Sequence, residues 1–215
     1  MRRTMAKASL MTAMNLLFFT VIGTAMLAIT YNQTHERIAQ SELDAKLKLI
    51  SQLVPPSAFD NDIVRDTLDI APDPLLGNDK PTLAYRARQG EKPVAVVLEA
   101  TAPDGYSGKI NLIIAIQPDG SVGGVRVVAH KETPGLGDYI DIAHSNWIKG
   151  FDGKALMAGK DGNWKVKKDG GQFDYMAGAT ITPRAVIKAV HKALQYYAKH
   201  QATLFAQPAV QPHSP

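Results

Sequence analysis

The chain has 215 residues, of which 45% are hydrophobic and 20% charged, and its formal net charge is +4. This composition supports a packed core, whereas the mild, scattered positive charge argues against nucleic-acid binding. Because the chain contains no cysteine, disulfide bonds, cysteine-ligated zinc, iron–sulfur clusters and c-type haem attachment are excluded.

Residues 9–30 carry no charged side chain. About 20 residues of helix, rising about 1.5 Å each, cross a hydrocarbon core about 30 Å thick. We therefore expect a transmembrane helix over residues 9–30. Arg2, Arg3 and Lys7 precede it, so the positive-inside rule places residues 1–8 in the cytoplasm and the rest of the chain outside.

A cleaved signal peptide is the alternative reading of this apolar segment. Ala25 and Ala28 form a small-x-small pattern of the kind found at cleavage sites. The apolar run is longer than the usual core of a signal peptide, and this length favours an anchor.

Residues 31–80 are expected to form an amphipathic helix and a connecting segment. From about Gln33 to Val54 apolar residues recur mostly every three or four positions, and Pro55 then ends the helix. The stretch from Asp60 to Lys80 has few periodic apolar residues and is predicted to be rich in loops.

Residues 81–205 are expected to form a domain that begins with a series of strands. Short β-rich runs separated by glycine-containing turns predict an antiparallel meander. The four expected strands are Thr82–Arg88, Val94–Thr101, Ile110–Gln117 and Val122–Ala129. Weak helical spacing follows over Asp138–Lys149, and Trp164–Lys168 is predicted to be another short strand.

The last element is a helix with Thr182 as its cap and Pro183 at its first helical position. Its apolar face includes Val186, Val190 and Leu194. Residues 206–215 are rich in proline and are expected to be a disordered tail. The fold class is therefore α+β: an N-terminal transmembrane helix followed by a domain with a mainly antiparallel sheet flanked by helices.

The most informative segment is Asp174–Pro183, which reads Asp-Tyr-Met-Ala-Gly-Ala-Thr-Ile-Thr-Pro. Gly178 and Ala179 leave the hydroxyl of Thr180 open to a modifying enzyme and give room for a large substituent. The helix start that follows offers unpaired N–H groups and a positive dipole to an anion such as a phosphate.

These residues resemble the flavinylation motif of the FMN-binding domain in RnfG-type and NqrC-type subunits. In that family FMN is joined through its phosphate to the threonine that ends a D-x-x-[S/T]-G-A-T pattern. Asp174, Gly178, Ala179 and Thr180 match the pattern. Ala177 replaces the usual serine or threonine, which leaves the acceptor hydroxyl in place.

Two further segments carry the resemblance. His130–Asp138 (His-Lys-Glu-Thr-Pro-Gly-Leu-Gly-Asp) is similar to the HxETPGLGD element of the RnfG family. Ala102–Ile110 contains Gly-Tyr-Ser-Gly and is similar to that family's GYSG turn, which favours the RnfG branch over the NqrC branch. With the flavinylation motif, the resemblance covers roughly Val94–Leu194.

The resemblance implies a covalent FMN on Thr180, no metal and no catalytic residue of an independent enzyme. Asp174 is expected to serve recognition by a flavin transferase, and Arg184 is either a phosphate partner or a solvated surface residue. The other expected cofactor-binding residues are Thr133, Gly135, Leu136, Gly178, Ala179 and Thr182. Among them, Leu136 is expected to lie against the flavin ring and Thr133 to hydrogen-bond its polar edge.

By the same resemblance, the chain is an electron-relaying flavoprotein subunit of an ion-translocating oxidoreductase complex of the Rnf/Rsx type. Its partners would be the other subunits, the membrane and the transferase. The implied location is the bacterial inner membrane, with a single pass and most of the chain in the periplasm. Two alternatives are an FMN subunit of a sodium-pumping quinone reductase and a membrane-tethered assembly module without flavin.

Overall fold

The computed structural model describes residues 2–157 and 163–206. The chain divides into two compact units, Met1–Lys46 and Leu47–Pro215. Helix α1 (Arg2–Leu53) supplies the first unit, and its last turns belong to the second. The expected anchor and the expected amphipathic helix are continuous in α1, because no proline interrupts the chain before Pro55.

The N-terminal part of α1 is long and apolar enough to cross a membrane. Its threonine hydroxyls donate hydrogen bonds to carbonyls four residues earlier: Thr20 to Leu16 over 2.8 Å and Thr30 to Met26 over 2.9 Å. Such bonds satisfy the hydroxyls within the helix, as a hydrocarbon environment requires.

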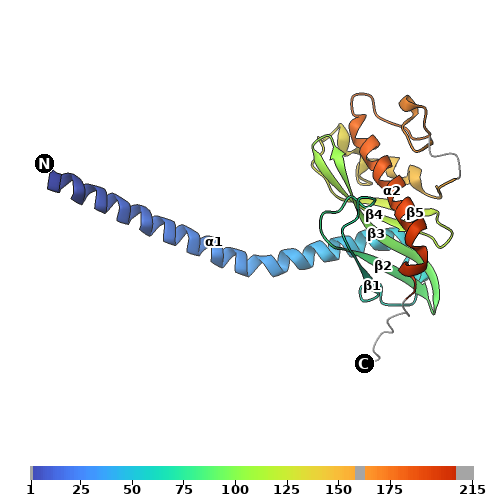
Figure 1. Ribbon diagram of the computed structural model, residues 1–215, viewed down its shortest axis with the longest axis horizontal. Helices are drawn as coiled ribbons and strands as arrows, with labels where there is room; N and C mark the ends of the chain where they lie inside the picture. Colours follow the sequence, from blue (N-terminus) through green and yellow to red (C-terminus); the bar gives the residue numbers. More distant parts are fainter. Residues whose placement is uncertain (1, 158–162, 207–215) are drawn as a thin grey trace. The chain divides into compact units, whose positions relative to one another are not determined.

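The second unit contains a five-stranded antiparallel sheet with the strands in chain order (Figure 1). This confirms the predicted meander. Strand β1 was missed, because it has only four residues and lies at the sheet edge, paired with β2 alone. The strands are β1 (Thr67–Ile70), β2 (Thr82–Gln89), β3 (Lys92–Gly105), β4 (Gly108–Ile116) and β5 (Val122–Ala129).

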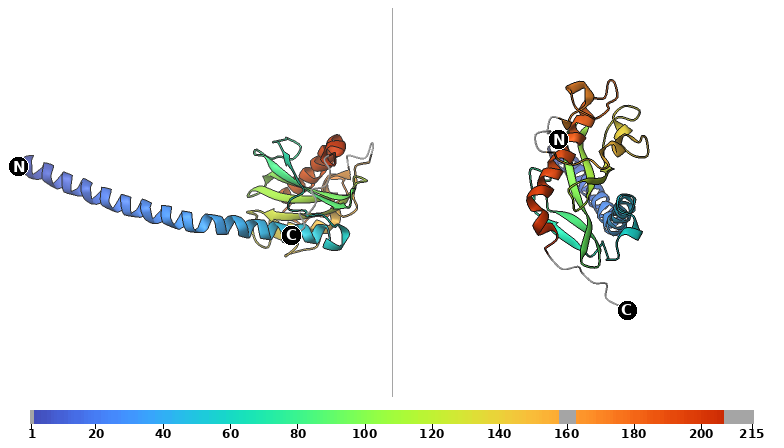
Figure 2. Two further views of the ribbon diagram at one scale, coloured as in Figure 1. Left: turned by 90° about the horizontal axis from the view of Figure 1, so that it is seen from below. Right: turned by 90° about the vertical axis from the view of Figure 1, so that its right-hand side faces the viewer.

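Each face of the sheet is covered by a helical segment of the second unit (Figure 2). Val96 and Leu98 of β3 pack in the cluster that contains the apolar residues of α2 (Ile181–Leu204). The intervening Val97 packs instead with Ile50 near the end of α1. Successive strand residues point to opposite faces, so a continuous apolar run indicates a sheet covered on both sides.

Helix α2 begins two residues earlier than the sequence predicted. Thr180 is its N-cap residue, although it makes no side-chain capping hydrogen bond. The prediction of Thr182 as the cap was wrong, because its hydroxyl lies within the first turn and bonds to Glu132. Pro183 still lies in the first turn, where the proline nitrogen removes no intrahelical bond.

Two other local predictions were wrong. The segment predicted as a weak helix forms two short 3-10 helices, η2 (Gly137–Ile140) and η3 (Trp147–Phe151). The segment predicted as a strand near Trp164 has a single bridge, Val166 to Phe173, followed by η5 (Lys167–Asp169). A further 3-10 helix, η1 (Pro56–Ala58), follows α1. Of the predicted tail 206–215, all but its first residue lies outside the described residues.

Candidate functional site

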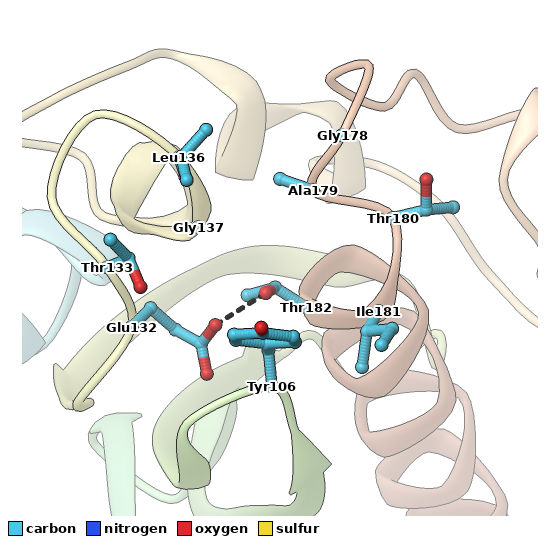
Figure 3. A pocket seen from close by; sticks show the side chains of 10 residues that line it. All are labelled: Tyr106, Glu132, Thr133, Leu136, Gly137, Gly178, Ala179, Thr180, Ile181 and Thr182. Carbon is cyan, nitrogen blue, oxygen red and sulfur yellow. Dashed lines mark hydrogen bonds between the residues drawn. The ribbon is translucent and has the colours of Figure 1, made fainter.

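A cavity of about 200 Å³ lies where three segments converge on the start of α2. One wall is the loop after β5, His130–Asp138, which is called the glycine-rich loop below. The opposite wall is the segment that leads into α2 (Figure 3). The β3–β4 turn contributes Tyr106. The lining residues are Tyr106, Glu132, Thr133, Leu136, Gly137, Gly178, Ala179, Thr180, Ile181 and Thr182.

Glu132 joins the three segments. Its side chain is only 5% exposed. The carboxylate accepts a hydrogen bond from the Ser107 amide, 3.0 Å from Oε1, and another from the Thr182 hydroxyl, 2.6 Å from Oε2. The buried carboxylate depends on these bonds, because burying an unpaired carboxylate away from water costs free energy. The carboxylate therefore fixes the β3–β4 turn and the first turn of α2 to the glycine-rich loop.

Two glycines shape the walls for different reasons. A Cβ at Gly137 would come within 2.6 Å of Glu132 Oε2, so only glycine fits beside this carboxylate. Gly178 has φ +85°, in the left-handed region that glycine adopts without strain, and nothing lies within 4 Å of its missing Cβ. The first glycine is required by packing and the second by backbone conformation.

Thr180 follows a tight turn in which the Ala179 amide donates to the Met176 carbonyl over 3.1 Å. Its side chain is partly exposed and makes no capping hydrogen bond. In Figure 3 the Thr180 hydroxyl points away from the Glu132–Thr182 pair, on the outer side of the wall formed by Ala179. Within the described residues, this hydroxyl is therefore partly exposed and caps no backbone N–H group of the helix.

Ion pairs lie beside the segment that leads into α2. Arg184 contacts both carboxylate oxygens of Asp169, at 2.6 and 2.7 Å, and its side chain is exposed to solvent. The hydrogen bond and charge of Arg184 lower the pKa of the Asp169 carboxyl below its usual value. Asp174 pairs with Lys167 at 2.5 Å, and both side chains are exposed.

The structure brings most of the sequence-predicted site residues to one cavity. Thr133, Leu136, Gly178, Ala179, Thr180 and Thr182 all line it. Gly135, at φ +75°, lies in the glycine-rich loop but not in the lining, and Asp174 lies outside it.

Sequence reasoning missed three lining residues: Tyr106, Glu132 and Ile181. Tyr106 lies in the Gly-Tyr-Ser-Gly turn between β3 and β4, and Glu132 lies in the glycine-rich loop. Their places in these two motifs could have indicated that both residues belong to the site. Ile181 had no signal, because its role depends on where α2 begins.

Comparison with known proteins agrees with this geometry. Residues 105–195 match the family model of an FMN-binding domain, and residues 1–53 match that of the RnfG N-terminal region. The chain belongs to the RnfG family of ion-translocating oxidoreductase complex subunits. The matched FMN-binding region contains all ten residues that line the cavity.

Relatives in this family resemble the chain over most of its length. The G subunit of the ion-translocating oxidoreductase complex of Pseudomonas aeruginosa (strain UCBPP-PA14) is 45% identical over 95% of this chain and 94% of its own. Its counterpart in Vibrio cholerae (strain O395) is 47% identical over 88% and 90% of the two chains. The counterpart in Shewanella baltica is 46% identical over 90% and 91%.

Proposed function

We propose that this RnfG-family protein is a membrane-anchored flavoprotein subunit that relays electrons within a multi-subunit ion-translocating oxidoreductase complex. Its FMN is joined to the Thr180 oxygen by a phosphoester bond. Family membership supports the complex, and the match to an FMN-binding domain supports the cofactor. The observation that carries the attachment site is the partly exposed Thr180 hydroxyl at the edge of the cavity, which caps no backbone N–H group of the helix.

The residues present fit a phosphate at this position. The first N–H groups of a helix lack intrahelical partners, and Thr180 supplies no side-chain cap to them. An anion esterified to Thr180 would therefore lie close to unpaired donors and to the positive end of the α2 dipole. Arg184, one turn into α2, adds a positive charge on the same side, although Asp169 already balances it.

The cavity fits a flat ring held at the surface. Pockets that enclose a drug-sized ligand have volumes of roughly 300–1,000 Å³. This cavity of about 200 Å³ is smaller, so part of a bound flavin would stay in contact with solvent or a partner. Leu136, which is 48% exposed, would lie against the ring, Thr133 would hydrogen-bond its polar edge, and Gly135 would let the backbone approach.

Loading would be a phosphotransfer from FAD by a magnesium-dependent flavin transferase. The Thr180 oxygen would form a bond to the phosphorus of the FMN half of FAD, the bond from that phosphorus to the oxygen bridging the two phosphates would break, and AMP would leave. The hydroxyl proton passes to the transferase or to solvent. Asp174, which is exposed beside the Met176–Ala179 turn, would be recognised by the transferase. Once bound, FMN supplies the electron-accepting ring, while the protein positions it and sets its surroundings.

The anchor and the basic N-terminus support the location that we propose. The apolar part of α1 would cross the bacterial inner membrane once, with residues 1–8 in the cytoplasm. The segment 31–80 and the FMN-binding domain, 81–205, would then lie in the periplasm. A covalent bond suits that compartment, because a dissociated FMN would not readily be replaced there.

Intact-mass spectrometry of the full chain tests the attachment. Protein produced with an active transferase, FAD and magnesium should gain the mass of one FMN less water, and Thr180→Ala should not. Thr203→Ala removes a threonine hydroxyl that donates to the His200 carbonyl, away from the cavity, and should keep the adduct. A bare mass for the wild type, or an adduct on Thr180→Ala, would contradict the proposal.

A further inference from the structure

A buried tyrosine contacts the backbone of the acceptor turn at two points. Tyr139, in η2, is 6% exposed. Its hydroxyl oxygen lies 3.3 Å from the Met176 amide, which donates to it, and 3.4 Å from the Ala179 carbonyl, to which it donates. These two contacts join the first and last residues of the turn that ends immediately before Thr180.

The tyrosine itself is held by a cluster of rings. Trp147, in η3, meets Tyr139 edge-on at 5.5 Å and meets the buried Phe151 in the same way at 5.5 Å. The Trp147 indole N–H donates to the Asp174 carbonyl over 2.7 Å, which adds a third fixed point at the start of the motif. Edge-to-face packing restricts the direction of a ring, so the Tyr139 hydroxyl is pre-positioned for the turn.

The acceptor side chain has no comparable support of its own. Thr180 makes no side-chain capping bond, and Gly178, with no Cβ, gives the turn little stiffness. The position of the Thr180 backbone, from which its side chain extends, therefore depends on Ala179, whose carbonyl accepts the hydrogen bond from Tyr139.

We propose that Tyr139 is a positioning residue for the modification of Thr180: its hydroxyl holds the Met176–Ala179 turn in the shape that presents the threonine oxygen to the diphosphate of FAD. This inference rests on the proposed function of Thr180 as the flavin acceptor. A nucleophile held near its attack position needs less ordering in the transition state. The Tyr139 hydroxyl should therefore raise the rate of flavin transfer and leave the binding of the transferase unchanged.

The protonation state of the tyrosine agrees with this role. Burial raises the pKa of the Tyr139 phenol above its usual value. The hydroxyl therefore keeps its proton at physiological pH and remains able to donate to the Ala179 carbonyl.

Loading kinetics of the full chain, purified in detergent from cells without transferase, test the inference. Tyr139→Phe removes only the hydroxyl. The matched control is Tyr197→Phe, which removes a buried tyrosine hydroxyl that donates to the Pro118 carbonyl over 3.2 Å, away from the cavity. With purified transferase, FAD and magnesium, we expect Tyr139→Phe to lower the maximal loading rate about tenfold. The KM of the transferase for the chain should stay unchanged. Tyr197→Phe should load like the wild type.

Amide hydrogen exchange supplies a readout that does not depend on the transferase. Loss of the Tyr139 hydroxyl should speed exchange at the Met176 amide, whereas Tyr197→Phe should leave it unchanged. Wild-type loading rates in Tyr139→Phe, or equal slowing in both variants, would overturn the inference while leaving Thr180 as the acceptor. A wild-type chain that takes up no flavin would overturn the proposed function and this inference with it.

Discussion

The two walls of the cavity are built in opposite ways. The glycine-rich loop is fixed from the inside, through the buried Glu132 carboxylate and the close approach of Gly137. The acceptor segment is exposed along most of its length, with Met176 40% exposed, and is held mainly through backbone atoms. If Thr180 carries the flavin, as proposed, the difference has a reason: the wall beside the ring needs a constant shape, whereas the segment that the transferase modifies needs to be accessible.

Removing Glu132 should have the largest effect on folding stability. In Glu132→Ala, the Ser107 amide and the Thr182 hydroxyl both lose their acceptor, and we expect the free energy of unfolding to fall by about 3 kcal/mol. Glu132→Gln keeps one acceptor oxygen and should lose less. Urea unfolding followed by tryptophan fluorescence measures both, and equal midpoints for the wild type and Glu132→Ala would show that the carboxylate does not stabilise this wall.

Replacing one glycine in each wall by alanine should distinguish the loss of stability caused by a steric clash from the loss caused by an unfavourable backbone conformation. Gly137→Ala places a methyl group 2.6 Å from Glu132 Oε2 and should lower the free energy of unfolding by about 2–3 kcal/mol. Gly178→Ala meets no neighbour but keeps a positive φ, and should cost about 1 kcal/mol. Thermal unfolding of the two variants gives the comparison. A larger loss of stability in Gly178→Ala than in Gly137→Ala would contradict the prediction that the glycine-rich loop is the more tightly packed wall.

The ion pair beside the acceptor wall should have the smallest effect. Arg184 lowers the Asp169 pKa in the folded state, so the stabilisation is complete above the usual carboxyl pKa and is lost as the pH falls through the lowered value. Both side chains are solvent-exposed, so the contribution to stability is small.

An NMR titration of the Asp169 carboxyl carbon checks this shift directly. Arg184→Gln removes the charge and should move the titration midpoint upward, toward the usual carboxyl range. An identical midpoint in the wild type and in Arg184→Gln would mean that the pair does not persist in solution.

The main elements could be predicted from the sequence because their signals are local. Val94–Thr101 and Ile110–Gln117 are apolar runs between turn residues. The first lies within the longer β3, and the second coincides with β4 except at the strand ends. The acceptor segment was recognisable because Gly178, Ala179 and Thr180 stand together in one short motif. The glycine-rich loop could be identified in the same way.

The remaining features depend on contacts between distant parts of the chain. The start of α2 could not be located, because Thr182 looks like a cap until its bond to Glu132, 50 residues earlier, is known. Tyr139 looks like one apolar residue of a weak helix, and only the fold brings its hydroxyl to a turn that lies almost 40 residues later. Such pairings leave no periodicity in the sequence.

The small volume of the cavity has a consequence for how the proposed cofactor would be retained. A short tether keeps its group at an effective concentration in the millimolar range or above. With FMN on Thr180, as proposed, the ring would stay near Leu136 even where its own contacts are weak. The pocket would then be free of any demand for tight affinity, and a cavity of about 200 Å³ would suffice in both oxidation states of the cofactor.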